Sequence, residues 1–130
     1  MTIFKKYIFL TFLVLLSTVI DTSAANCVDA VSRAFEKGNV SELAVLIEGN
    51  VSLSLPGAQA NYSKAQAEMI LQDFFKKNDI RQLHIHRKGD NKYTSFVIGQ
   101  VVTSKGTYKL YISVKTNDQN CIVKEIRVEK

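Results

Sequence analysis

Residues 63–88, SKAQAEMILQDFFKKNDIRQLHIHRK, decide the fold because the spacing of their apolar residues changes part-way along. Ser63 and Gln66 fit a capping box, in which a hydroxyl and an amide satisfy free N–H groups at the start of a helix. The residues that follow place an apolar side chain at every third or fourth position, which predicts an amphipathic helix that ends near Asn78. This apolar stripe consists of Ala67, Ile70, Leu71, Phe74 and Phe75.

Beyond Asn78 the apolar residues recur at every second position, which is the period of a strand. Leu83 and Ile85 fall on one face of the predicted strand, and Arg87 continues that face. The opposite face carries polar side chains, namely Gln82, His84, His86 and Lys88. Residues 89–92, GDNK, then predict a turn.

Three further strands are predicted after this turn, each joined to the next by a short hairpin. Residues 93–103 are apolar on both faces, which is typical of a central strand covered on both sides for part of its length. Gly99 in its middle suits a bulge or a sharp bend. One face holds Tyr93, Val97 and Val101, and the other holds Phe96, Ile98 and Val102. The last two strands turn apolar residues inward, namely Tyr108, Leu110, Ile112 and Val114, and then Ile122, Ile126 and Val128.

The chain before the capping box predicts two helices, a strand and a loop. Residues 27–37 have helical spacing, and a short second helix begins at Ser41 as its N-cap. Residues 51–55 alternate as a half-buried strand, and the polar residues up to Tyr62 predict a loop. The element order is therefore α-α-β-α-β-β-β-β. It predicts an α+β fold, in which two N-terminal helices and one longer central helix pack on a curved, mainly antiparallel sheet.

The N-terminus resembles a secretory signal peptide. Its parts are a positive start with Lys5 and Lys6, an apolar run from Ile8 to Ile20, and small residues up to Ala24. The run is shorter than the roughly 20 apolar residues that cross a bilayer as a helix. We expect residues 1–24 to be cleaved and residues 25–130 to form one exported domain, periplasmic or secreted, with no membrane contact after cleavage. An uncleaved anchor and lipidation at Cys27 are the alternatives.

The chain has two cysteines, Cys27 and Cys121. An oxidising compartment permits one disulfide between them, which would tie the start of the exported domain to its last strand. Two separate thiols are the alternative, because the sequence does not give the distance between the two residues.

The net charge of +5 is spread along the chain. The densest basic cluster consists of Arg81, Arg87, Lys88 and Lys92, and even there two acids intervene, Asp79 and Asp90. A nucleic-acid-binding protein usually concentrates its basic residues in a stripe or patch. The sequence therefore predicts no nucleic-acid partner, and the charge is expected to keep the domain soluble.

His84 and His86 share one face of a predicted strand, with their Cα atoms about 7 Å apart. Two imidazoles in this arrangement suit a zinc or copper ion, but such a site needs at least one more ligand. No cluster of Cys, His or Asp follows at ligand spacing. The sequence therefore predicts two solvent-facing histidines on an edge strand, no metal and no cofactor.

Five short segments carry a resemblance to a known group of proteins. They are Ser54-Leu55-Pro56-Gly57, residues 61–68 (NYSKAQAE), Asp73-Phe74-Phe75, Val102-Thr103-Ser104 with Gly106, and Glu125-Ile126-Arg127. With the element order, they make the chain resemble a bacterial family of exported domains of uncharacterised function within the nuclear transport factor 2-like superfamily. The resemblance implies a cone of helices against a curved sheet, and it implies no catalytic residue.

A cone of this kind can hold a ligand between its helices and its sheet. The walls would be Ile70, Phe74, Tyr93, Val97, Tyr108, Leu110 and Ile112. A filled core is the alternative, because the pattern does not show whether these side chains leave space between them. The leading hypothesis is a non-enzymatic exported domain that binds a small molecule, a peptide or an envelope partner through its cone or its sheet face.

The superfamily resemblance also implies a second hypothesis, an isomerase-like or dehydratase-like enzyme with its active site in the cone. Proton abstraction needs a carboxylate base in an apolar pocket, within hydrogen-bonding reach of the substrate. Tyr93 and Tyr108 could donate a proton, but the predicted inward faces contain no acid apart from Glu125, whose face the pattern does not fix. The sequence therefore favours a binding domain and predicts no catalytic residue.

A third hypothesis is a homodimer that forms through the sheet. Tyr111, Val123 and the outward apolar residues of the strand 93–103 would lie at its interface.

Overall fold

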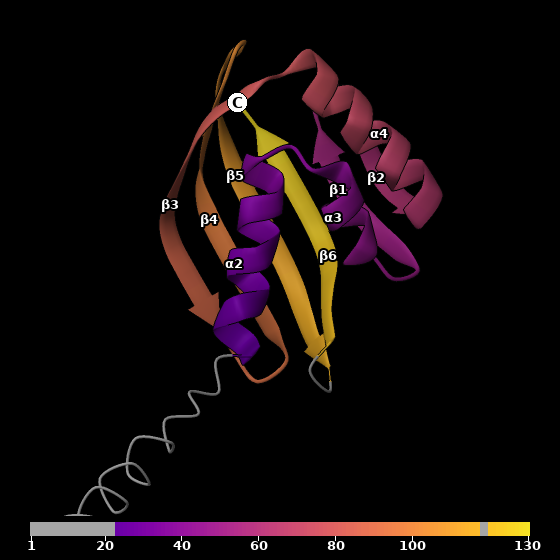
Figure 1. The fold of residues 1–130 in the computed structure, drawn as a ribbon, viewed down its shortest axis with the longest axis vertical. Helices are drawn as coiled ribbons and strands as arrows, with labels where there is room; N and C mark the ends of the chain where they lie inside the picture. Colours follow the sequence, from indigo (N-terminus) through magenta and orange to yellow (C-terminus); the bar gives the residue numbers. More distant parts are fainter. Residues whose placement is uncertain (1–22, 118–119) are drawn as a thin grey trace, which may run out of the picture.

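Three helices pack on one side of a six-stranded sheet in the computed structural model of the protein, which describes residues 23–117 and 120–130 (Figure 1). The helices are α2 (Ser23–Glu36), α3 (Val40–Val45) and α4 (Lys64–Lys77). The strands are β1 (Asn50–Leu55), β2 (Ala58–Ser63), β3 (Ile80–Asp90), β4 (Thr94–Thr103), β5 (Gly106–Asn117) and β6 (Asn120–Glu129). The predicted α+β class and order of elements are confirmed, and β2 is an additional strand.

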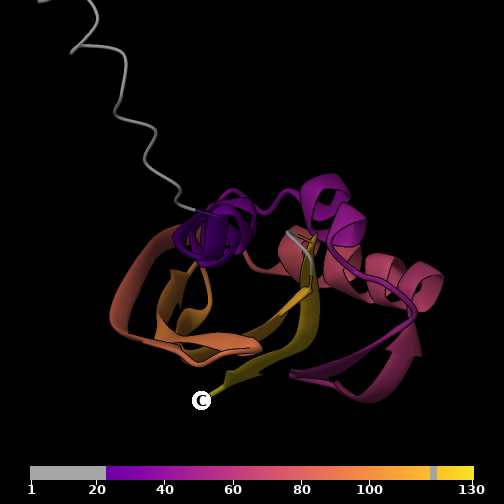
Figure 2. The same ribbon diagram turned by 90° about the horizontal axis from the view of Figure 1, so that it is seen from below.

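The sheet has the strand order β2-β1-β6-β5-β4-β3. β1 and β6 run parallel, and the other neighbouring pairs are antiparallel. Figure 2 shows that the sheet bends beneath the helices, so that all three helices lie on its concave side. α2 packs against β3, β4 and β5, whereas α4 packs against β1 and β2. We call the space between the helices and the concave face the cone.

The predicted signal peptide remains a prediction, because residues 1–22 lie outside the described part of the chain. Within the described part, no helix is long and apolar enough to cross a membrane.

α4 forms where the capping box predicts it. The Ser63 Oγ accepts a hydrogen bond from the Gln66 backbone N–H, and the Gln66 side chain accepts one from the Ser63 N–H. The apolar stripe of the helix faces the cone, where Ala67, Leu71 and Phe74 are buried. The cap and the stripe therefore fix both the start of α4 and the side that it buries.

β2 occupies residues that the sequence predicted as a loop. Pro56 and Gly57 turn the chain, Gly57 with a φ of 88°, and Leu55 then pairs with Ala58. β2 lies at the edge of the sheet and is mostly exposed, so it needs no alternation of apolar and polar residues. That absence of alternation is why the prediction of a loop was wrong.

α3 begins two residues earlier than predicted. Its N-cap is Asn39, whose side-chain oxygen accepts a hydrogen bond from the Glu42 N–H at 3.2 Å. Ser41 lies inside the helix, so its prediction as the cap was wrong. Asparagine and serine are similarly good caps, and the sequence offered both.

A bulge between β5 and β6 changes which residues of β6 face the cone. Ser113 pairs with Glu125 and Val114 with Val123, so Lys124 is the extra residue on β6. Val123 is therefore fully buried in the core. The predictions that Val123 faces outward and Ile122 inward were wrong, because strict alternation cannot place an extra residue.

Gly99 lets β3 approach β4 closely. A Cβ atom at residue 99 would collide with the backbone carbonyl oxygen of His84 and would lie 3.2 Å from the Cα of Ile85. β3 also carries a register shift beside this point, between Ile85 and Arg87. The predicted bulge therefore lies opposite Gly99, on β3, and not in the strand that contains Gly99.

We predict that Gly99→Ala destabilises the protein, because its methyl group must push the two strands apart. The free energy of unfolding should fall by about 1–3 kcal/mol, the usual cost of overpacking. Urea denaturation followed by circular dichroism measures this change. Gln100→Ala, at the exposed neighbouring position, is the control and should change stability by less than about 0.5 kcal/mol. Equal stability of the two variants would contradict the close approach.

The two cysteines form a disulfide, as one of the two alternatives predicted. Cys27 in the second turn of α2 is bonded to Cys121 in β6, with their Cα atoms 5.6 Å apart. Cys27 is buried and Val28 beside it belongs to the core. The disulfide therefore fixes the N-terminal part of α2 to the sheet.

We predict that removing the disulfide with Cys27→Ser and Cys121→Ser together lowers the free energy of unfolding. The bond joins residues 94 positions apart, and closing a loop of that length stabilises by about 4–5 kcal/mol on the chain-entropy model. Denaturation with and without a reductant measures the effect. The wild-type protein should lose stability on reduction while the double variant does not respond. A wild-type protein that is indifferent to reductant would contradict the prediction.

Candidate functional site

A β-bulge in β3 changes the face on which the end of this strand presents its side chains. Ile85 pairs with Gly99 and Arg87 pairs with Ile98, so His86 is an extra residue on β3. Gly99 lies among the concave-side positions of β4, whereas Ile98 is 40 % exposed on the outer side. Arg87 therefore lies on the outer face, and its predicted place on the inward face was wrong.

Two charged residues beyond the bulge lie on the concave side. Lys88 pairs with Val97, and Asp90 pairs with Ser95. Val97 and Ser95 are both buried on the concave side of β4. The alternating pattern placed Lys88 on the opposite face and Asp90 in a turn, and both predictions were wrong because β3 continues to Asp90 past an extra residue.

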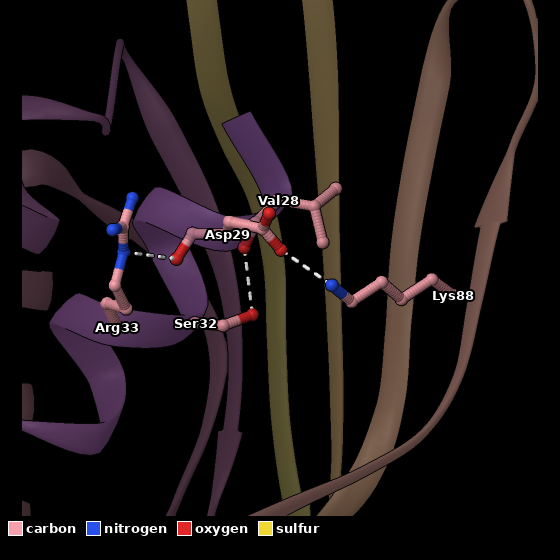
Figure 3. A network of polar contacts seen from close by, with 5 residues as sticks. All are labelled: Val28, Asp29, Ser32, Arg33 and Lys88. Atoms are coloured by element: carbon pink, nitrogen blue, oxygen red, sulfur yellow. Dashed lines mark hydrogen bonds and ion pairs between the residues drawn. The ribbon is translucent and has the colours of Figure 1, made fainter. Parts of the chain in front are cut away.

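An ion pair joins β3 to α2 at this place. The Nζ of Lys88 lies 2.6 Å from Oδ1 of Asp29, with one side chain reaching from each element (Figure 3). The two side chains are 50 % and 45 % exposed. Ion pairs this open to water contribute on the order of 0–1 kcal/mol. The pair therefore orients the two side chains toward each other, and breaking it costs little free energy.

The next turn of α2 adds two polar side chains that bond to their own helix. The Ser32 Oγ donates to the Val28 carbonyl at 2.8 Å, and the Arg33 Nε donates to the Asp29 carbonyl at 3.3 Å (Figure 3). Both bonds run back four residues along α2. The Asp29 carboxylate points away from them, toward Lys88.

Two open hollows share Asp29 in their lining. The smaller, of about 190 Å³, is lined by Val28, Asp29, Lys88, Gly89, Asp90 and Ser95. The larger, of about 340 Å³, is lined by Asp29, Ser32, Arg33, Glu36, Leu83 and Ile85. We call the two hollows together the α2–β3 cleft. Asp29 lines both hollows, and Lys88, its ion-pair partner, lines the smaller one.

A buried hydroxyl holds a second carboxylate at the cleft. The Ser95 Oγ donates to Oδ1 of Asp90 at 2.9 Å, and Ser95 is 3 % exposed. Asp90 itself is exposed. The lining of the smaller hollow therefore includes one ammonium group, from Lys88, and two carboxylates, from Asp29 and Asp90.

The residues predicted as cone walls lie in different environments. Val97, Leu110 and Ile112 are each at most 2 % exposed and pack in the core. Ile70 and Phe74 line a groove of about 400 Å³ between α4 and the turn that joins β1 to β2.

The two predicted tyrosines also lie apart from each other. Tyr108 is buried and borders a separate hollow near the end of β6. Tyr93 is 61 % exposed and precedes β4, so it does not face the cone. The predicted wall residues are therefore not brought together at one cavity.

The two histidines are both exposed on β3. His86 is the extra residue of the bulge, so the regular spacing expected of the pair is interrupted. Within residues 23–117 and 120–130, no group of three or more His, Cys, Asp or Glu side chains could hold a metal ion.

The outer face of the sheet carries the aromatic residue predicted for self-association. The Tyr111 ring stacks on Phe96 at 6.2 Å between centroids, and the Arg127 guanidinium lies 5.2 Å from the Tyr111 ring. Glu125 pairs with Arg127, and its hydrogen bond and negative charge raise the pKa of the guanidinium. Glu125 therefore belongs to this charged outer surface. The outer side of β4 is half-buried toward its ends and exposed in its middle, so the strand is covered on this side for only part of its length.

The fold is that of the nuclear transport factor 2-like α+β cone. Solved structures with little sequence identity share it, among them the protein "Rd1NTF2_04 with long sheet", at 14 % identity and a TM-score of 0.64. That alignment covers 81 % of this chain and 98 % of the other. A putative calcium/calmodulin-dependent protein kinase type II association domain from Thiobacillus denitrificans aligns with a TM-score of 0.62 at 12 % identity, over 77 % of this chain and 88 % of that one.

Within this class, the chain belongs to the DUF4783 family, a domain of unknown function, whose model matches residues 28–129. A crystal structure of a family protein from Bacteroides ovatus is 29 % identical, with a TM-score of 0.71 over 78 % of this chain and 92 % of that one. A family protein from Bacteroides uniformis is 24 % identical, with a TM-score of 0.73 over 78 % and 94 %. No curated protein matches the chain.

The charged residues of the cleft were not among the predicted site residues. Asp29 lies in the helix predicted for residues 27–37, and nothing in the pattern singles it out. The alternation of the following strand predicted that Lys88 faces away from the helices. Gly99 was the available signal, because a glycine inside a strand often marks a bulge or a close approach of the partner strand. A bulge opposite Gly99 would have moved Lys88 to the concave side.

We predict that Lys88→Met has little effect on stability, because the ion pair that it removes is half-exposed. The free energy of unfolding should fall by about 1 kcal/mol or less. Lys109→Met, at an exposed position on the outer face of β5, is the matched control and should behave similarly. Urea denaturation compares the two variants. A loss above about 3 kcal/mol for Lys88→Met alone would mean that the pair is buried and not open to solvent.

Proposed function

We propose that this protein is an exported, non-catalytic binding domain that holds a small polar ligand in the α2–β3 cleft. The observation that carries the proposal is the Asp29–Lys88 ion pair, which joins two elements across an open cleft. A pair of this exposure opens at little cost, so a ligand can take over its charges. Each hollow also offers apolar surface beside the charges, from Val28 in one and from Leu83 and Ile85 in the other.

The packing of the cone supports a site at its opening over one in its interior. The side chains of Val97, Leu110 and Ile112, which would have walled an interior pocket, are buried against other core residues. Ligand sites combine apolar surface with a few converging polar groups. The α2–β3 cleft offers this combination at the side of the cone between α2 and the edge strand β3.

The exposure of the carboxylates supports binding over acid–base catalysis. A general base that abstracts a proton from carbon needs an apolar, water-poor site that sets its pKa. The Asp29 side chain is 45 % exposed and already paired with an ammonium group, and Asp90 is exposed. These carboxylates suit recognition of charge.

Three observations support a location outside the cytoplasm. The Cys27–Cys121 disulfide is a feature of proteins that fold in oxidising compartments. The N-terminal residues have the composition of a signal peptide, and the family includes proteins of Bacteroides species. The ligand would then be met in the cell envelope or outside the cell.

The proposal is tested by screening a library of small polar fragments against the isotopically labelled protein by NMR. We expect the fragments that bind to shift the backbone amide signals of residues 28–36 and 83–90, because these residues line the cleft. Signals from the groove beside α4 should not move.

A pair of matched variants then locates the site. Ile85→Trp fills the larger hollow from an isoleucine that is 37 % exposed, and it should weaken fragment binding by about tenfold or more. Ile98→Trp changes an isoleucine of similar exposure, 40 %, on the outer face of β4, and it should leave binding unchanged. Shifts that map to another surface, or an Ile85→Trp protein that binds normally, would contradict the proposal.

A further inference from the structure

The Asp29–Lys88 ion pair leaves charged hydrogen-bonding capacity unused at the cleft. A lysine ammonium has three N–H donors, and a carboxylate has two acceptor oxygens. The pair is made between one donor atom and one oxygen, Oδ1 of Asp29. Asp90, in the same hollow, has Oδ1 in a hydrogen bond with Ser95. The hollow therefore offers both signs of charge within one small space.

The charges expected of the ligand can be inferred from how ligand binding would change the Asp29–Lys88 ion pair. An anion that binds Lys88 in place of Asp29 leaves the Asp29 carboxylate without its partner. A cation that binds Asp29 leaves the Lys88 ammonium without its partner. A ligand with a single charge can therefore form an ion pair with only one of the two groups, whereas a ligand with both charges can form one with each.

We propose that the ligand of the α2–β3 cleft is a small zwitterion of the α-amino-acid type. Its carboxylate binds the ammonium of Lys88, and its ammonium binds the carboxylates of Asp29 and Asp90. Inserted in this way, the ligand replaces one ion pair with two and leaves no charge without a partner. This inference rests on the proposed function and adds the chemical class of the ligand.

The size and lining of the cleft favour an amino acid with an apolar side chain. The smaller hollow, of about 190 Å³, has room for the charged groups and a few carbon atoms. The larger hollow is lined by Asp29 too, together with Leu83 and Ile85. Ile85 is 37 % exposed, so an apolar side chain placed there removes its surface from water. Leucine is therefore a suitable probe.

The test compares leucine with two derivatives that each lack one of its charges. N-acetylleucine keeps the carboxylate, and leucinamide keeps the ammonium group. Titration of each compound into the labelled protein, followed by NMR, gives a dissociation constant and the residues affected. We expect leucine to shift the signals of residues 28–36 and 83–90, and each derivative to bind more weakly by up to about fivefold, because it lacks one of the two exposed ion pairs.

Variants of the protein assign each charge of the ligand to its partner. Lys88→Met should remove the preference for leucine over leucinamide, because the ligand carboxylate has lost its partner. Asp29→Asn should reduce the preference for leucine over N-acetylleucine in the same way. Lys109→Met, the exposed control on the outer face, should bind all three compounds as the wild-type protein does.

The outcomes separate this inference from the proposed function. If leucinamide or N-acetylleucine binds as tightly as leucine, the zwitterion proposal is overturned and the cleft remains a binding site. If leucine does not bind while polar fragments still shift the cleft signals, the zwitterion proposal is likewise overturned and the proposed function stands. If neither leucine nor any fragment shifts those signals, both proposals are overturned.

Discussion

Gly99 of β4 lies against the backbone of His84 in β3, and the cleft depends on this contact. The extra residue of β3, His86, follows directly after it. A bulge inserts one residue and changes the face on which later side chains lie. Without this bulge Arg87 would face the cone and Lys88 would face outward. The bulge thus places an ammonium group opposite the Asp29 carboxylate.

The position of α2 depends on a second constraint, the Cys27–Cys121 disulfide. It fixes the helix two residues before Asp29, while Val31, Ala34 and Phe35 bury the apolar side of the same helix against the core. The Asp29 side chain therefore has a defined place relative to the edge strand β3. A covalent bond and a β-bulge, on separate elements, together set the distance between the two charges of the cleft.

Most of the fold could be predicted from the sequence because its signals are local. The cap at Ser63 and the apolar stripe of α4 depend on residues within a few turns, and they predicted the helix closely. The faces of β3 and β6 could not be predicted in full, because an extra residue such as His86 or Lys124 is defined by the partner strand. The charged cleft could not be predicted for the same reason, because Asp29 and Lys88 are 59 residues apart in the sequence and the pattern does not show that they meet.

The most direct test of this account is the nuclear Overhauser effect between the side chains of β3 and those of α2 in the labelled protein. The account predicts cross-peaks between the methylene protons of Lys88 and the β protons of Asp29, because Nζ and Oδ1 lie 2.6 Å apart. Arg87, on the outer face, should give no cross-peaks to α2. Cross-peaks from Arg87 to α2, with none from Lys88, would show that β3 has no bulge and would contradict the account.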